Sequence, residues 1–397
     1  MKLHTILWRA ALTAALALLP LASAAAAAAA PANAIKIGLL APLSGPFADF
    51  GDQFVKGVEL FMQEHGDTVA GRKIVVLKRD ANGVDPAQTK RQAQALLTRD
   101  HVQFLAGFGL TPDALAVASL GTEAKVPMVI MNAATGFITK KSPYFVRFSF
   151  TLAQIVTPLA DWAAKNGIKN VYVAVSDYAP GYEAEKAFDQ AFTAAGGHVV
   201  GSVHIPLRNP EFAPYVQHIK DVKPQAVFLF LPSGQQPTNF VREFIQFGLR
   251  KAGVKLLGGT EVIDDTALGM LGDDALGAIS TQVYSYAHPS ALNRKYISGW
   301  TKRFGAHPQP DFMSVAAYDG MHAIYDVIVQ LHGNIDGDKA MAVFKTLKFD
   351  SPRGPIEVDP ATREMIENVY IRRVARVNGA LVNKEIVTFP AVKAPGP

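Results

Sequence analysis

The chain has 397 residues, of which 49% are apolar and 18% are charged, and 39 Lys and Arg residues stand against 34 Asp and Glu residues. This composition excludes a disordered tail, and the length predicts two or three domains that each bury a core. The absence of cysteine excludes disulfide scaffolds, thiolate metal sites, cysteine nucleophiles and the lipidated cysteine of bacterial lipoproteins. The formal net charge of +5 is spread along the chain, so no nucleic-acid partner is predicted.

The N-terminus has the pattern of a cleavable secretory signal peptide over residues 1–34. Two basic residues precede an apolar run, and an Ala-x-Ala exit and a tract of alanines follow. The alternative is a membrane anchor, but the run is shorter than the roughly 20 strongly apolar residues that a span needs and contains Pro20. Cleavage after Ala24 or after Ala34 fits the pattern. Removing the segment lowers the formal charge from +5 to +3, and we expect an exported protein.

Past the leader, short apolar strands alternate with amphipathic helices. In this first part we expect strands at 35–43, 73–80, 103–109 and 126–132, and helices at 49–64, 85–98 and 112–124. The strands are nearly continuously apolar, which is typical of parallel sheets that are covered by helices on both faces. Repeated strand–helix units with right-handed crossovers predict a doubly wound α/β sheet.

The same alternation restarts after residues 144–150, which predicts a second lobe of similar architecture. We expect strands at 171–177, 198–206, 225–232 and 255–262, and helices near 152–166, 181–195, 211–221 and 237–250. A strand at 279–285, helices near 291–305 and 314–332, and an antiparallel hairpin over 368–389 that turns at Asn378-Gly379 follow. Since no Ser/Gly-rich linker separates the halves, we expect hinge motion rather than independent lobes.

The sequence contains no recognisable catalytic or metal-binding motif. The ten histidines form neither HExxH nor a spaced pair, and a G-x-S-x-G elbow and a Walker loop are both missing. Gly107-Phe108-Gly109 follows a strand, but the third glycine of a dinucleotide fingerprint would fall at Pro112. The pairs Asp264-Asp265 and Asp273-Asp274 are interpreted as solvated loop carboxylates, because sequence neighbours point apart. We therefore predict no catalytic residue, no metal and no cofactor.

Two loops at the carboxyl ends of neighbouring strands are candidates for binding an anion. The first is Leu110-Thr111-Pro112, with Thr111 expected as the N-cap of a helix and Pro112 as its first residue. Free N–H groups and the helix dipole favour a carboxylate there. The second is Ala133-Ala134-Thr135-Gly136, which emerges beside the first in a parallel sheet. The alternative is that Thr111 only caps its helix and Thr135 only stabilises a turn.

The segment Ile35 to Gly57, IKIGLLAPLSGPFADFGDQFVKG, resembles the opening of the leucine/isoleucine/valine-binding proteins of ABC importers, which are type I periplasmic binding proteins. The similarity continues through Lys78-Arg79-Asp80, AGFGLTPDALA, MVIMNAATG, Ser176-Asp177, Gly258-Gly259-Thr260-Glu261 and Tyr318-Asp319-Gly320. Each motif is weak by itself, but the ordered set spans essentially the whole mature chain.

This resemblance implies two Rossmann-like lobes that are joined by a three-crossing hinge and close on a small ligand. We expect crossings near 148–151, 279–284 and 351–357, lobe 1 over 35–149 with 282–354, and lobe 2 over 150–281 with 355–397. The implied function is that of an unanchored, monomeric substrate-binding protein in the periplasm, which delivers a small carboxylate to a membrane permease and performs no chemistry. The alternatives are a ligand-sensing receptor component of the same fold and a periplasmic enzyme.

The resemblance also implies individual ligand contacts. In the family a Ser or Thr after the third strand and an Ala-x-Thr in the next loop hold the ligand carboxylate, and Thr111, Ala133 and Thr135 match them. A Glu on the second lobe accepts the ammonium group of amino-acid ligands, and Glu261 matches it loosely. The alternative for Glu261 is an exposed loop carboxylate.

The sequence departs from the family pattern at positions that concern the ligand. Phe50 stands where amino-acid binders often carry Tyr, and a family Tyr that touches ligand falls near Ser233. The expected aromatic wall comprises Phe47, Phe50, Phe108, Phe137, Tyr178 and Tyr182. Such a pocket suits an aromatic or aliphatic acid as well as a branched-chain amino acid. The predicted ligand contacts are Phe50, Phe108, Leu110, Thr111, Ala133, Ala134, Thr135, Tyr178, Ser233 and Glu261.

Overall fold

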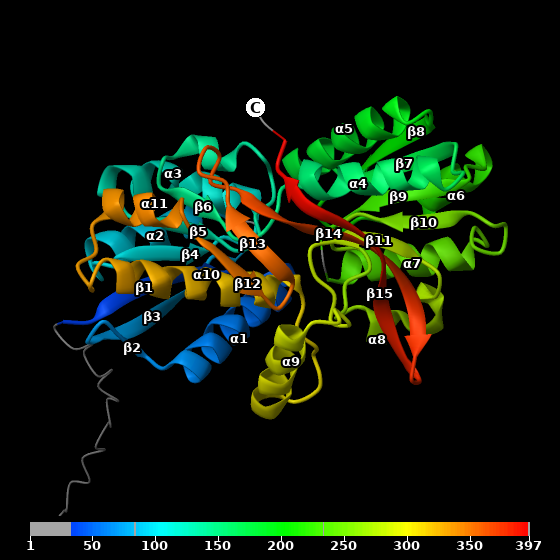
Figure 1. Cartoon of the computed structure of the whole chain (residues 1–397). Helices are drawn as coiled ribbons and strands as arrows, with labels where there is room; N and C mark the ends of the chain where they lie inside the picture. The colour runs from blue at the N-terminus through cyan, green and yellow to red at the C-terminus, as the bar shows by residue number, and fades with distance from the viewer. Residues whose placement is uncertain (1–32, 83–84, 233, 396–397) are drawn as a thin grey trace, which may run out of the picture. The chain divides into compact units, whose positions relative to one another are not determined.

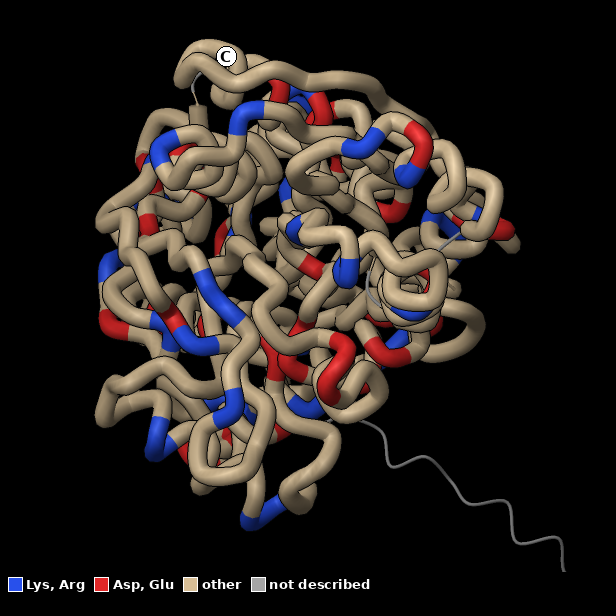
Figure 2. The backbone as a smooth tube through the Cα atoms, turned by 90° about the vertical axis from the view of Figure 1, so that its right-hand side faces the viewer, with Lys and Arg blue, Asp and Glu red and all other residues tan. Residues whose placement is uncertain are grey.

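The computed structural model describes residues 33–82, 85–232 and 234–395, which form two β-sheets with their helices (Figure 1). The predicted signal peptide, apart from its last two residues, and the predicted contact Ser233 lie outside the described residues. Within the described part of the chain, no helix combines the length and the apolar character that crossing a membrane requires. Figure 2 shows that residues of both charge signs are interspersed along the backbone.

The smaller sheet has six strands in the order β2-β3-β1-β4-β5-β6. All its pairings are parallel except β2 with β3. The central strand is apolar and almost wholly buried, because helices cover both faces of a parallel sheet. Its strands are β1 (Ile35–Ala41), β2 (Thr68–Val69), β3 (Arg72–Asp80), β4 (Phe104–Gly107), β5 (Met128–Ile130) and β6 (Phe145–Arg147). The helices between them are α1 (Ala48–His65), α2 (Pro86–Thr98) and α3 (Thr111–Ala124).

The larger sheet has nine strands, eight of them in the order β12-β13-β14-β11-β10-β9-β7-β8, and β15 pairs with β14. Its parallel strands are β7 (Asn170–Ser176), β8 (His198–Ile205), β9 (Ala226–Phe230), β10 (Lys255–Gly258) and β11 (Ile279–Gln282). Its antiparallel part comprises β12 (Lys348–Ser351), β13 (Gly354–Val358), β14 (Met365–Val377) and β15 (Ala380–Lys393). The associated helices are α4 (Leu152–Lys165), α5 (Ala179–Ala194), α6 (Ala213–Val222), α7 (Gln235–Gln246) and α8 (Leu268–Leu271).

Helices from late in the chain return to the smaller sheet. They are α9 (Ala291–Phe304), α10 (Phe312–Gln330) and α11 (Gly337–Phe344). Helices α10 and α1 are in extensive contact, and Gly57 permits it, because a Cβ at this position would lie 2.2 Å from the Ser314 carbonyl oxygen. The chain therefore runs from the smaller sheet to the larger sheet and back again.

The predicted fold class is confirmed. Most of the parallel strands are shorter than expected, whereas the hairpin strands β14 and β15 extend beyond the predicted 368–389. The hairpin turns at Asn378 and Gly379, both with positive φ, as the Asn-Gly signal predicts. The prediction missed β2, β6, α8, α11, β12 and β13. Strand β12 has only four residues, and none of its first three is buried, so it lacks the apolar run by which a buried strand is recognised.

Buried arginines join the segments through which the chain passes between the sheets. Arg353 donates to Asp319 at 2.9 Å, to Glu367 at 2.7 Å and to the Phe148 carbonyl oxygen at 2.6 Å, and both ion pairs are about 1% exposed. We call Asp319, Arg353 and Glu367 the arginine network. Burial raises the pKa of Glu367 to about 8, although the Arg353 charge opposes this shift.

Candidate functional site

The two candidate loops lie side by side, as predicted, because β4 and β5 are adjacent parallel strands. The Ala133 N–H donates to the Phe108 carbonyl oxygen at 2.9 Å, and Asn132 Nδ2 donates to the Gly109 carbonyl oxygen at 2.8 Å. We call residues 108–111 and 132–136 the two-loop site. The contacts between them fix the relative position of the two loops.

The two predicted threonines meet at the centre of the two-loop site. Thr111 Oγ1 and Thr135 Oγ1 lie 2.7 Å apart, and both residues are buried, at 2% and 1% exposed. The predicted contacts Leu110, Ala133 and Ala134 belong to the same loops and are also buried. Two convergent hydroxyls can each donate to an oxygen of a bound carboxylate.

The prediction that Thr111 is a helix N-cap is wrong. Helix α3 begins at Thr111 itself, and its N-cap is Leu110, which has no side chain that could cap. The N–H groups of Asp113 and Ala114 donate to the Leu110 carbonyl oxygen, and Pro112 has no N–H. The helix start therefore offers fewer free amide donors than expected, and the Thr111 hydroxyl turns to Thr135 instead of capping.

Phe108 holds a strained backbone conformation at the first loop. Its φ is +65°, a region that residues other than glycine rarely adopt. The conformation is fixed on both sides, because the Phe108 N–H donates to the Leu40 carbonyl oxygen at 3.0 Å and its own carbonyl oxygen accepts from Ala133. Strain of this kind is often found at ligand-binding sites.

Arg147 supports the second loop from behind and was not identified from the sequence. Its guanidinium is fully buried and donates to the Thr135 carbonyl oxygen at 2.8 Å and to the Ala133 carbonyl oxygen. It also pairs with Glu364 at 2.5 Å. Glu364 lies 217 residues away in sequence, so no local sequence pattern could predict this contact. Within residues 33–82, 85–232 and 234–395, no Lys or Arg side chain hydrogen-bonds to either threonine hydroxyl.

A buried carboxylate lies two residues beyond Thr111. Asp113 is 0% exposed, and Thr89 Oγ1 donates to it at 2.8 Å. Its other oxygen has no hydrogen-bond partner among the described residues. Burial raises the pKa of Asp113 to about 6, because a low-dielectric setting without a cation disfavours the charged form.

The larger sheet contributes Tyr178 and Glu261, which follow the carboxyl ends of β7 and β10. Glu261 is 6% exposed, so the alternative of an exposed loop carboxylate is wrong. Burial and the nearby Glu261 carboxylate raise the pKa of Tyr178, which places these two predicted residues close together. The adjacent Thr260 has φ +28° and is 0% exposed.

The prediction that Asp264 and Asp265 are solvated is also wrong. They are 2% and 3% exposed, and Asp265 accepts from the Tyr286 N–H and from Asn383 Nδ2, each at 2.9 Å. These partners come from elements distant in sequence, which fold over the loop and exclude water. Burial, first of all, raises the pKa of Asp264 to about 7, and the neighbouring Asp265 charge adds to the shift. In contrast, Asp273 and Asp274 are exposed, as predicted.

The expected aromatic wall is divided between core and surface. Phe47, Phe50 and Phe108 are at most 3% exposed and belong to one hydrophobic core. Phe137 and Tyr182 are 38% and 44% exposed, and they contact Lys141 and Asp177 on the surface. Phe50 and Phe108 stay predicted contacts, whereas the exposure of the other two rings speaks against a continuous aromatic wall.

The two-loop site is hydrogen-bonded to two helices of the larger sheet. The Leu152 N–H, at the start of α4, donates to the Ala134 carbonyl oxygen at 3.1 Å. The Gly136 N–H donates to the Glu183 carboxylate, with N–O distances of 3.0 and 2.9 Å. Glu183 lies in α5 and is half-buried. Glu183 was not identified from the sequence, because an acidic residue in the first turns of a helix is already explained by the helix dipole.

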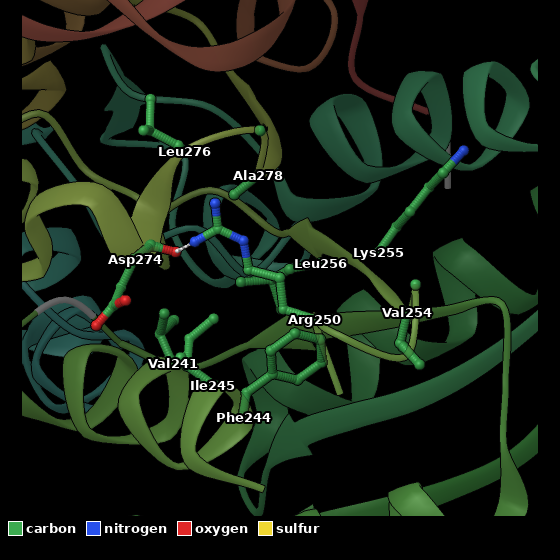
Figure 3. A pocket seen from close by; sticks show the side chains of 12 residues that line it. Val241, Phe244, Ile245, Arg250, Val254, Lys255, Leu256, Asp274, Leu276 and Ala278 are labelled. Atoms are coloured by element: carbon green, nitrogen blue, oxygen red, sulfur yellow. Dashed lines mark hydrogen bonds between the residues drawn. The ribbon is translucent and has the colours of Figure 1, made fainter. Parts of the chain in front are cut away.

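The two sides also face each other across a cavity of about 540 Å³. Gly45, Phe47 and Asp49 line it from the smaller sheet, and Asn209 and Gln236 are among its residues from the larger sheet. A second cavity of about 200 Å³ lies near the amino ends of β10 and β11. It is apolar apart from side chains such as Arg250, which donates to the Asp274 carbonyl oxygen (Figure 3). Neither cavity is lined by a predicted ligand contact.

Among the described residues, no group of three or more His, Cys, Asp or Glu side chains could hold a metal ion. The two-loop site therefore offers hydroxyl and amide donors. The larger sheet offers the buried carboxylate of Glu261 with Tyr178 beside it. Such a set can orient an anion but contains no activated nucleophile of the kind that acyl transfer requires.

Comparisons with known proteins identify similar chains over nearly the full length. A family model described as periplasmic binding protein matches residues 34–380. A solute-binding protein of an ABC transporter from Rhodopseudomonas palustris BisB5, solved in complex with 3,4-dihydroxybenzoic acid, is 47% identical, with 91% of this chain and 99% of that chain covered and a TM-score of 0.89. Another from R. palustris, in complex with 4-hydroxybenzoate, is 43% identical, with 91% and 98% covered and a TM-score of 0.88. Leu/Ile/Val-binding protein homolog 6 of Brucella melitensis is 44% identical over 366 residues, 92% of this chain and 94% of its own.

Proposed function

Because the chain belongs to the periplasmic binding protein family of ABC transporters, we propose that it captures a small aromatic carboxylate and delivers it to a membrane permease. The observation that carries this proposal is the pair of buried hydroxyls, Thr111 and Thr135, that meet at 2.7 Å. A ligand carboxylate would replace their mutual hydrogen bond by two charge-assisted ones. The cargo would be bound without any covalent step, by a monomeric protein in the periplasm.

The preference for an aromatic acid rests on two similar proteins and on the opposite wall of the site. Two solved relatives at 47% and 43% identity hold hydroxybenzoates. In our proposal the carboxylate lies at the threonines, and a phenolic O–H donates to the buried Glu261 beside Tyr178. The second candidate is a branched-chain amino acid, since the B. melitensis relative is named a Leu/Ile/Val-binding homolog. Its ammonium group would then face Glu261.

The remaining predicted contacts are part of this proposal. Leu110, Ala133 and Ala134 would contact the carboxylate end, and Phe50, Phe108 and Ser233 would contact the body of the ligand. We further propose lobe 1 as 35–149 with 282–354 and lobe 2 as 150–281 with 355–397. Sheet membership supports most of this division, but the boundary at 354 is the first residue of β13, whose hairpin pairs with the larger sheet.

Isothermal titration calorimetry with five ligands tests the proposal: 4-hydroxybenzoate, 3,4-dihydroxybenzoate, benzoate, leucine and phenylalanine. We expect both hydroxybenzoates to bind most tightly, because they fill the apolar space and satisfy polar groups at both ends. Benzoate should bind more weakly, because it leaves Glu261 without a phenolic donor. Tight binding of leucine with no heat from the benzoates would overturn the aromatic assignment.

The variant Glu261→Gln separates the two candidates further. With a hydroxybenzoate the amide oxygen can still accept from the phenol, so we expect a loss of affinity of roughly tenfold or less. With leucine the loss of a buried charge pair with the ammonium should exceed about a hundredfold. Glu123→Gln, an exposed carboxylate in α3, is the matched control and should leave the affinity for every ligand unchanged.

A further inference from the structure

A hydrogen bond connects the threonine-bearing loop to helix α5 on the other side of the site. Gly136, the residue after Thr135, donates its N–H to the carboxylate of Glu183 at 3.0 and 2.9 Å. The loop follows β5 of the smaller sheet, whereas Glu183 lies in α5, which packs on α4 and on β7 of the larger sheet. The bond therefore spans two parts of the molecule that a hinge motion separates.

The loop approaches α5 closely at Gly136. A Cβ on Gly136 would lie 3.0 Å from Glu183 Oε1 and 4.0 Å from the Thr151 side chain. The first distance is tighter than most side-chain contacts, so with a larger residue the carboxylate would have to shift by a few tenths of an ångström. Gly136 therefore lets the loop and the helix meet without that shift.

The carbonyl groups of the same loop have other partners. Arg147 binds the carbonyl oxygens of Ala133 and Thr135, and the Leu152 N–H donates to the Ala134 carbonyl oxygen at 3.1 Å. Arg147 belongs to β6, and Leu152 begins α4 directly after the crossing segment. Glu183 on α5 therefore links this loop to a helix that is not adjacent to the crossing segment in the chain.

The setting of Glu183 suits it to accept this N–H. Its side chain is half-buried beside the loop. Burial, first of all, and the Glu364 charge raise the pKa of Glu183, while the Gly136 N–H, the Arg147 charge and the Ala153 N–H lower it. A carboxylate taken partly out of water gains from each fixed donor, and it has the Gly136 N–H only while the two lobes are together.

We propose that Glu183 is a positioning residue that couples lobe closure to ligand affinity. On closure its carboxylate accepts a hydrogen bond from the Gly136 N–H. This bond fixes the 133–136 loop with the Thr135 hydroxyl directed toward Thr111. On opening the loop loses this partner, and the two hydroxyls lose their fixed geometry. The effect on affinity rests on the proposed function, whereas the effect on closure does not.

The lack of native cysteine makes closure directly measurable by double electron–electron resonance. Spin labels on the exposed positions Lys90→Cys in α2 and Lys220→Cys in α6 report the separation of the lobes. In the ligand-free protein we expect Glu183→Ala to shift the distribution to longer distances. For Glu183→Gln, which keeps an acceptor oxygen, we expect label-to-label distances between those of Glu183→Ala and those of the parent. Gln190→Ala, exposed on the same helix, should match the parent.

Dissociation of 4-hydroxybenzoate, followed by stopped flow, gives the second readout. We expect Glu183→Ala to release the ligand about tenfold faster, with partial recovery in Glu183→Gln and little change in the association rate. Unchanged distances and unchanged release in Glu183→Ala would overturn the proposal, and circular dichroism of each variant verifies folding. If the parent protein binds no ligand, the proposed function fails, and the spin-label distances alone then support or overturn the role of Glu183.

Discussion

The arginine network and the two-loop site bury polar groups in opposite ways. In the network, Asp319 and Glu367 both contact the guanidinium of Arg353. In the two-loop site the central groups are the neutral hydroxyls of Thr111 and Thr135, and the nearby guanidinium of Arg147 is already engaged by Glu364 and by carbonyl oxygens. Charges thus fix the segments between the sheets, whereas the site keeps neutral donors that a ligand anion can engage.

The largest expected effect is that of removing Arg353. Arg353→Met leaves Asp319 and Glu367 buried without their cation, so we expect a loss of about 3–5 kcal/mol in the free energy of unfolding. Urea denaturation measures it. We expect the double variant Arg353→Met, Glu367→Gln to recover part of the lost free energy of unfolding, because it removes one of the uncompensated charges. A loss below about 1 kcal/mol would show that the network does not hold the crossing segments.

The pH dependence of stability examines Asp113, a buried carboxylate that lies two residues beyond Thr111. Because the pKa of Asp113 is raised from 3.8 to about 6, the folded state binds this proton more tightly than the unfolded state. The stability that this group contributes is therefore complete below pH 4 and is lost as the pH rises through about 6. Asp113→Asn should raise the free energy of unfolding at pH 8 by up to roughly 3 kcal/mol and leave it nearly unchanged at pH 4.

The matched control for this prediction is Asp274→Asn, at an exposed carboxylate. It should give the parent profile at both pH values. An Asp113→Asn profile that parallels the parent between pH 4 and 8 would mean that water or another group compensates this charge, and the contrast with the arginine network would then fail.

Substitutions of threonine by valine, which has nearly the same shape, test the hydroxyl pair of Thr111 and Thr135. Thr111→Val or Thr135→Val removes a donor to a charged ligand group, so we expect a loss of affinity for 4-hydroxybenzoate of about 10- to 100-fold in calorimetry. The conservative variant Thr135→Ser keeps the hydroxyl and should stay close to the parent. Equal affinity in Thr111→Val, Thr135→Val and the parent would remove both threonines from the site.

The smallest expected effect belongs to an exposed pair of the same chemical type. Arg376 contacts Asp273 on the surface, with side chains 48% and 71% exposed. Arg376→Met should change the free energy of unfolding by less than about 1 kcal/mol, because solvent screens such pairs. A loss as large as that of Arg353→Met would show that burial is not what distinguishes the two arginines.

The sequence predicted those parts of the molecule that local patterns determine. Continuous apolar strands and the Asn378-Gly379 turn predicted the α/β fold and the hairpin, and strand adjacency brought Thr111 and Thr135 together. Contacts between distant segments were missed. Arg147 pairs with Glu364 across 217 residues and Glu183 reaches Gly136 across 47. Asp265 is buried by Asn383, 118 residues away, so its local sequence wrongly indicated a solvated loop.

The route of the chain has a consequence for the order in which the protein can fold. The smaller sheet is assembled from the first 147 residues, but it is packed against α10, which ends at Gln330. The larger sheet is bridged by β14, which ends at Val377. Neither half can therefore reach its native packing while the last third of the polypeptide is still being synthesised. We expect a nascent chain that stays loosely structured until it is nearly complete.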